Sequence, residues 1–213
     1  MQEKLDYYDI LGNVVPGLVL VGGTYMLASW LGYQLTLPPL PDALTVFVVV
    51  AIALVLGQVI QALSSILEPF YYWTWGGQPS ERLLSGQTRK FSVQYLDALK
   101  KRLRKRMLED EERDVEITNR DLFLYSLAVC NRNGLGRTSR FNSLYAYHRA
   151  LTTLGIFFLV VTILMLFWAQ PSPHGKKWVL GVECLSTALL WHRTRQRGEY
   201  FVDEVIRMAA DVG

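Results

Sequence analysis

The sequence predicts an all-α integral membrane protein with four transmembrane helices, the fourth of them short. Hydrophobic residues make up 51% of the chain and lie in long uncharged runs, which soluble domains seldom show. Basic residues crowd into residues 82–149 and 192–197. Because Lys and Arg stay on the cytoplasmic side of a membrane, this asymmetry predicts a helical cytoplasmic insertion between the second and third spans.

We therefore expect four parts along the chain. Residues 1–72 form a transmembrane hairpin, 73–148 a cytoplasmic helical module, 149–192 a second hairpin and 193–213 a cytoplasmic amphipathic tail. The short connection that contains Pro38, Pro39 and Pro41 has no Lys or Arg, which places it outside. Both termini are then expected in the cytoplasm.

The first span, from Ile10 to about Tyr33, carries Asn13, Pro16 and Gly17 on one helix face. Small residues let another helix backbone approach closely, so this face is expected to pack on the second span. The alternative is that Pro16 and Gly17 form a hinge or gate.

The second span changes character along its length. Ala43 to Leu56 is almost purely aliphatic, and the following residues place polar groups within an arc of about 120°. Unpaired amides are costly in lipid, so this stripe should face protein or water. We expect it to line a pore or to pack helices together, and its chemistry-bearing members are Gln58, Gln61, Ser65 and Glu68. Pro69 is expected to kink the helix or end it.

The fourth hydrophobic segment, Trp178 to Trp191, has 14 residues and contains Glu183. A carboxyl group at that depth must be paired, protonated or facing water. Its partner could be Gln58, Gln61 or a lysine of the preceding turn, residues 170–177, and the alternative is that it lines an ion pathway.

The cytoplasmic insertion contains an amphipathic helix from about Ser92 to Leu108, with Leu96, Leu99 and Leu103 on its apolar face. Its basic run could contact anionic lipid headgroups or simply be solvated, and nucleic-acid binding is less favoured. The run comprises Lys100, Lys101, Arg102, Arg104, Lys105 and Arg106. Thr118 and Asp121 predict the capped start of a second helix.

A turn at residues 131–140 contains two glycines and three arginines just before another helix. Free backbone N–H groups and the helix dipole favour anions there. Arg132, Arg137, Ser139 and Arg140 are therefore candidate ligands for a phosphate-bearing molecule such as a nucleotide signal. The spacing is not that of a P-loop. In the structural alternative, Asn133 and Gly134 end one helix and Ser139 caps the next.

Catalytic and metal-binding patterns are absent from the sequence. Cys130 and Cys184 lie in different segments, and the three histidines fit no ligand spacing, so neither a disulfide nor a metal site is expected. None of the common hydrolase, metalloprotease or redox motifs occurs. We expect no cofactor and no enzymatic activity, and a membrane enzyme with an unrecognised site that depends on Glu183 is the less favoured alternative.

Three segments resemble parts of small four-helix bacterial membrane proteins that accompany antiviral defence and CRISPR loci. They are YYDILGNVVPGLVLV, GQVIQALSSILEP and RGEYFVDEVIRMA. The resemblance implies an oligomeric, non-enzymatic effector that disturbs membranes and is located in the bacterial inner (plasma) membrane. Our expectation is a homo-oligomeric pore, controlled by the cytoplasmic module, with lipids and a cytoplasmic protein or nucleotide signal as partners. The alternative is a scaffold that recruits a cytoplasmic partner without a pore.

Overall fold

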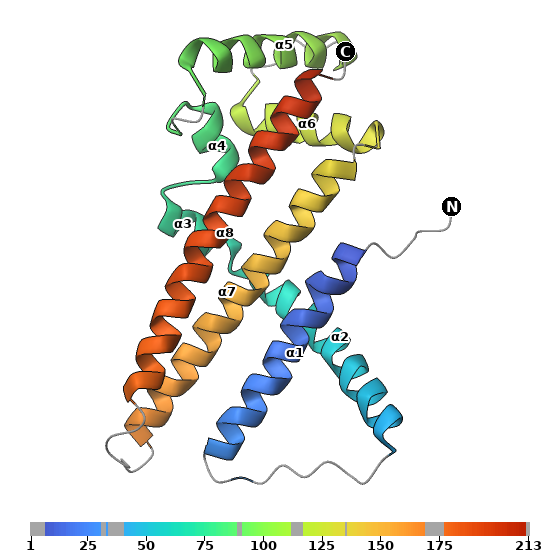
Figure 1. Ribbon diagram of the computed structural model, residues 1–213. Helices are drawn as coiled ribbons and strands as arrows, with labels where there is room; N and C mark the ends of the chain where they lie inside the picture. Colours follow the sequence, from blue (N-terminus) through green and yellow to red (C-terminus); the bar gives the residue numbers. More distant parts are fainter. Residues whose placement is uncertain are drawn as a thin grey trace. The chain divides into compact units, whose positions relative to one another are not determined.

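The computed structural model describes residues 7–30, 33, 41–88, 91–111, 117–134, 136–168 and 177–211 (Figure 1). Every regular element in these ranges is an α-helix, which confirms the all-α class. The helices are α1 (Tyr7–Trp30), α2 (Asp42–Ile66), α3 (Glu68–Trp75), α4 (Pro79–Leu84), α5 (Val93–Glu111), α6 (Asn119–Arg132), α7 (Gly136–Trp168) and α8 (Lys177–Asp211). Most of the predicted outer turns, residues 34–40 and 169–176, lie outside the described residues.

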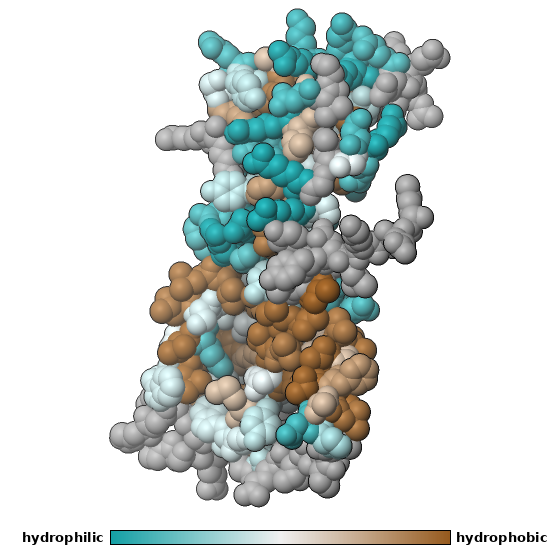
Figure 2. Space-filling view, turned by 45° about the vertical axis from the view of Figure 1, so that its right-hand side comes forward, coloured by the Kyte–Doolittle hydropathy of each residue, from teal (hydrophilic) through white to brown (hydrophobic). Residues whose placement is uncertain are grey.

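The chain divides into two compact units. The membrane unit comprises Met1–Glu68 and Ala146–Thr194, and the helical module comprises Pro69–Tyr145 and Arg195–Gly213. On the face shown in Figure 2, hydrophobic residues gather over the membrane unit and hydrophilic residues over the helical module. Most residues of the two expected hairpins belong to the membrane unit, and most residues of the expected insertion and tail belong to the helical module.

Three helical stretches are long and apolar enough to cross a membrane: Gly12–Trp30, Asp42–Ile66 and Arg137–Phe167. The expected fourth segment, Trp178–Trp191, is not among them. It forms the first part of α8, where the apolar stretch is short and charged residues follow it directly. The membrane class therefore rests on α1, α2 and α7.

Helices α1 and α2 pack closely because glycines leave room for the opposing backbone. A Cβ atom on Gly17 would overlap the backbone of Ala53, and one on Gly57 would overlap the backbone of Asn13. Both contacts run antiparallel, as expected for a hairpin, and close backbone approach gives dispersion contacts that lipid cannot replace.

In the membrane unit, α7 and α8 run side by side in opposite directions (Figure 1). The hydroxyls of Thr152 and Thr194 lie 2.8 Å apart and are buried. Further along, a Cβ atom on Gly155 would lie 2.8 Å from the Thr187 hydroxyl. The Thr162 hydroxyl donates to Glu183 Oε1 over 3.0 Å. These three contacts fix one register, in which the apolar part of α8 follows the apolar part of α7.

The end of α2 and the start of α6 follow from residues close to them in the sequence. Helix α2 ends at Ile66, three residues before Pro69, as the proline predicts. Thr118 and Asp121 form the expected capping box of α6.

Helix α7 runs unbroken from Gly136, so Ser139 lies inside its first turn and the expected capping role of Ser139 is wrong. Gly134 has φ +61°, a left-handed conformation that glycine adopts without strain, just after α6.

The helical module has its own core. Leucines from α4, α5 and α6 pack against the last turns of α8, and the buried members include Leu84, Leu99, Leu103, Leu122, Val205 and Ile206. Leucines at three- and four-residue spacing put one face of α5 into this core, as the pattern predicts. The expected amphipathic tail is not a separate helix, because it continues α8 from the membrane unit.

Candidate functional site

The first polar centre of the membrane unit is built around Arg149 of α7, a buried residue. Its Nη1 lies 2.7 Å from Glu68 Oε1. Its Nε donates to Ser64 Oγ over 3.2 Å, and its Nη2 donates to Ser65 Oγ over 2.9 Å. The planar guanidinium fork matches these three acceptors at once, which a lysine could not do.

The Arg149 centre determines what the C-terminal end of the α2 stripe can do. Ser65 and Glu68 were expected to line a pore or to pack helices, and both bind Arg149. The charge of Glu68 is balanced within the unit, because Arg149 faces it at ion-pair distance. In this arrangement the two residues join α2 to α7.

A second polar contact repairs a defect in α1. Pro16 lies inside this helix and has no N–H group, so the carbonyl of Gly12, four residues earlier, lacks its usual helical donor. Gln61 Nε2 donates to this carbonyl over 2.9 Å. An unsatisfied carbonyl in lipid costs several kcal/mol by transfer scales. Gln61 therefore serves the α1–α2 hairpin.

Gln58 is the member of the stripe that stands apart. It lies inside the candidate span Asp42–Ile66, and its side chain is exposed on the surface of α2. No hydrogen bond joins its amide to any other residue that the structure describes. In lipid this amide would be an unsatisfied donor and acceptor.

Glu183 lies beside a groove between α1, α7 and α8, with a volume of about 650 Å³. Apolar residues form most of its wall, including Leu27, Trp30, Phe158 and Trp178. Thr162 binds one carboxyl oxygen of Glu183, and the other oxygen is buried without a partner among the described residues. The structure thus places Glu183 against α7 rather than beside Gln58 or Gln61.

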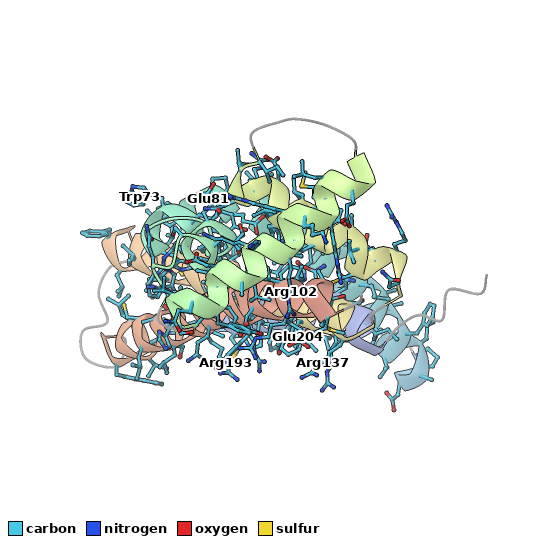
Figure 3. All side chains as sticks on the ribbon, turned by 90° about the horizontal axis from the view of Figure 1, so that it is seen from above. Trp73, Glu81, Arg102, Arg137, Arg193 and Glu204 are labelled. Carbon is cyan, nitrogen blue, oxygen red and sulfur yellow. The ribbon has the colours of Figure 1, made fainter. Side chains whose placement is uncertain are left out.

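The candidate phosphate ligands lie in the helical module. Arg137 Nε is 2.8 Å from Glu204 Oε1 of α8, and the two side chains are labelled near each other in Figure 3. The positive charge of Arg137 is therefore balanced by a carboxylate of its own chain. Arg132 lines a hollow of about 510 Å³ along α6, together with Asp121 and Tyr125. Ser139 and Arg140 are exposed on the first turn of α7.

The basic run of α5 is mostly solvent-facing. Lys101, Arg102, Arg104 and Lys105 are exposed, whereas Lys100 and Arg106 are half-buried. Arg106 Nη1 donates to the carbonyl of Ala209 over 2.9 Å, which fastens α5 to the end of α8. Lys105 and Glu109 form an ion pair at 3.6 Å with both side chains exposed, and such pairs contribute little to stability.

Sequence reasoning missed the central role of Arg149. It also missed Glu199, which faces Arg82 at 3.5 Å and Arg195 at 3.3 Å inside the module. The available signal for Arg149 was the polar stripe itself, because a face with two hydroxyls and a carboxylate calls for a cation with several donors.

The chemistry of these centres is that of helix packing and charge balance. Among the residues that the structure describes, no three His, Cys, Asp or Glu side chains gather where they could hold a metal ion. The fold and these centres define a helical protein with three candidate membrane spans. No family model, curated protein or solved structure matches the chain.

Proposed function

We propose that this protein is a non-enzymatic bacterial inner-membrane protein that self-associates and disturbs the membrane, as a pore or a related effector, under control of its helical module. Antiviral defence is the setting that the sequence resemblance suggests. The observation that carries the proposal is Gln58, an exposed amide in the most apolar of the candidate spans. A buried water path or a second copy would satisfy it, and lipid would not.

The proposal includes a fourth span made by the first part of α8. Its support is the contact register between α7 and α8, in which Thr194 lies beside Thr152 and Glu183 beside Thr162. If α7 crosses the bilayer, α8 accompanies it, and Thr162 hides part of the Glu183 carboxyl from lipid. Cysteines introduced at Trp178 and at Arg193 should then react with an impermeant thiol reagent from opposite sides of the membrane.

Control by the module is supported by two long helices. Helices α7 and α8 each contribute residues to both units without a break, so a change of packing around their module ends can alter the membrane unit. The signal we expect is a nucleotide or a protein partner. It would bind at Arg132, Arg137, Ser139 and Arg140, and Arg137 would leave Glu204 to take part.

The experiment that tests this function is ion leakage from liposomes that contain the purified protein, together with its mass in detergent. A discrete oligomer that leaks supports the proposal. Gln58→Leu should reduce leakage strongly. Val59→Leu, at the next position on the exposed surface of α2, is the matched control and should leave it unchanged. A leak that Gln58→Leu leaves intact would show that this amide has no part in permeation.

A membrane scaffold is the second candidate, and a different observation favours it. Gln61, Ser64, Ser65 and Glu68 all have partners inside one chain, so these polar groups need no permeation path. A scaffold would recruit its partner through exposed module residues such as Arg102 and Arg104 of α5. It would remain silent in the leakage assay, and charge reversal at these two arginines would abolish recruitment.

A further inference from the structure

We propose that copies of this chain associate through one face of α2, with Gln58 at its centre. This inference rests on the self-association in the proposed function and names the surface that makes it. The Gln58 face consists of Phe47, Ala51, Leu54, Gln58 and Ala62. At 100° per residue these five positions fall within an arc of about 80°.

Two other parts of the α2 surface differ in character from the Gln58 face. Ala53, Gly57, Ile60 and Ser64 are buried, and they lie on the side that packs on α1 and α7. A second arc carries the aliphatic side chains of Ile52, Val59 and Leu63, which are 48%, 49% and 44% exposed. That aliphatic arc suits lipid. The Gln58 face lies between the buried side and the aliphatic arc.

The chemistry of the Gln58 face favours a second copy over lipid. Phe47, Leu54 and Gln58 are exposed, so no other described part of the chain covers them. An amide carries both donors and acceptors, so two glutamines at the same depth satisfy each other across a symmetric interface. Copies inserted in the same membrane with the same orientation bring identical positions level. Small neighbours, Ala51 and Ala62, let the helices approach closely.

The spacing of the Gln58 face fits helix-on-helix packing. Positions 47, 51, 54, 58 and 62 alternate mainly between four and three residues, as in the seam of a left-handed helix pair. A polar residue at one such position fixes the register of the pair at some cost in stability. Ser65 continues the same line of α2 towards its C-terminal end, where it binds Arg149. Gln58 is the polar residue among the five of the Gln58 face, so its loss should weaken the association and also loosen its register.

The test is disulfide formation between full-length chains in liposomes, with copper phenanthroline as the oxidant. The background carries Cys184→Ser, because Cys184 is exposed, and keeps the buried Cys130. Leu54→Cys and Ala51→Cys should form cross-linked dimers efficiently. Ile52→Cys and Leu63→Cys, on the aliphatic arc, should not. Adding Gln58→Leu should lower the dimer yield of Leu54→Cys, with an apparent association constant down on the order of ten-fold.

Each outcome bears on a separate claim. Equal cross-linking on both arcs would mean random collision and would overturn the interface. An oligomer that leaks but cross-links at neither Leu54→Cys nor Ala51→Cys would also overturn it, while the proposed function would stand. Efficient cross-linking on the Gln58 face in liposomes that do not leak would support the interface and count against a pore. If the Leu54→Cys protein fails to insert into the liposomes, Ala51→Cys tests the same face.

Discussion

Gln61 of α2 supplies the hydrogen bond that Pro16 withholds from α1. Its Nε2 lies 2.9 Å from the carbonyl oxygen of Gly12, the group that a residue with an N–H at position 16 would satisfy. Pro16 is itself fully buried, so water cannot replace the missing donor nearby. The proline and the glutamine therefore form one structural unit across two helices.

This relationship predicts a specific non-additivity. Gln61→Leu should lower the free energy of unfolding by about 1 to 3 kcal/mol, because it leaves a buried acceptor unsatisfied. In a Pro16→Ala background the same change should cost much less, since the alanine introduced there has a backbone N–H that donates to the Gly12 carbonyl in the ordinary helical way. Unfolding in mixed micelles, measured for both single variants and the double variant, gives the coupling energy.

Gln58→Leu is the amide control for that cycle. Gln58 has no described partner within the chain, so its replacement should leave the monomer's free energy of unfolding nearly unchanged in either background. If the effects of Pro16→Ala and Gln61→Leu on the free energy of unfolding were additive, the Gln61 side chain would not replace the hydrogen bond that Pro16 cannot donate.

Replacing glycine by alanine should have opposite effects at two positions of α1, Gly17 and Gly22. Gly17→Ala should destabilise the hairpin, because its Cβ would overlap the backbone of Ala53. Gly22→Ala meets nothing within 4 Å and should stabilise α1 by up to about 1 kcal/mol through helix propensity. Thermal midpoints in one detergent compare the two variants directly. A gain in stability for Gly17→Ala would show that α1 and α2 do not meet there.

The Arg149 centre predicts that a conservative change is not conservative. Arg149→Lys keeps the charge but cannot reach Glu68, Ser64 and Ser65 together, so it should cost about 1 to 3 kcal/mol. Arg149→Met should cost more, because it removes the cation that lies 2.7 Å from the half-buried Glu68 carboxylate. Adding Glu68→Gln to Arg149→Met should restore part of that loss.

Arg104→Lys is the matched control for the Arg149 variants. Arg104 is exposed on α5, and its replacement should change the free energy of unfolding by less than about 0.5 kcal/mol. If Arg149→Lys and Arg104→Lys changed the free energy of unfolding equally, the contacts of Arg149 with Glu68, Ser64 and Ser65 would not stabilise the fold.

Sequence periodicity predicted the elements of this fold better than their partners. The polar stripe on α2 and the small residues of α1 both followed from 100° spacing, because helix geometry is local. The spacing of residues within one helix does not show which residues of another helix they contact. The sequence therefore showed that Ser65 and Glu68 need a partner but not that Arg149, more than 80 residues away, would be that partner.

The turn before α7 shows a second limit. Glycines at 134 and 136 and the hydroxyls at 138 and 139 fit several starting points for the helix. The structure begins it at Gly136 and buries Thr138, which leaves Ser139 in the first turn. Thr138 is 3% exposed, and the spacing within the turn does not show which of its hydroxyls is buried. The ion pair between Arg137 and Glu204 has the same origin, since α8 supplies the carboxylate.

The capping box of α6 predicts a pH dependence. The Thr118 hydroxyl and then the Thr118 backbone N–H donate to the carboxylate, and the charge of Arg120 adds to them, so the pKa of Asp121 lies below its usual value. A carboxyl group with a lowered folded-state pKa stabilises the fold above its unfolded-state pKa, about 3.9, and loses that effect as the pH falls through the folded-state pKa.

The parent should therefore have a higher thermal midpoint than Asp121→Asn at pH 6, and this difference should shrink between pH 4 and pH 3. Thr118→Ala removes the hydroxyl donor, so its midpoint should vary less with pH than the parent's over the same range. Circular dichroism melts of the three proteins measure this, and a difference between parent and Asp121→Asn that stays constant down to pH 3 would show that the Asp121 carboxylate does not stabilise the start of α6.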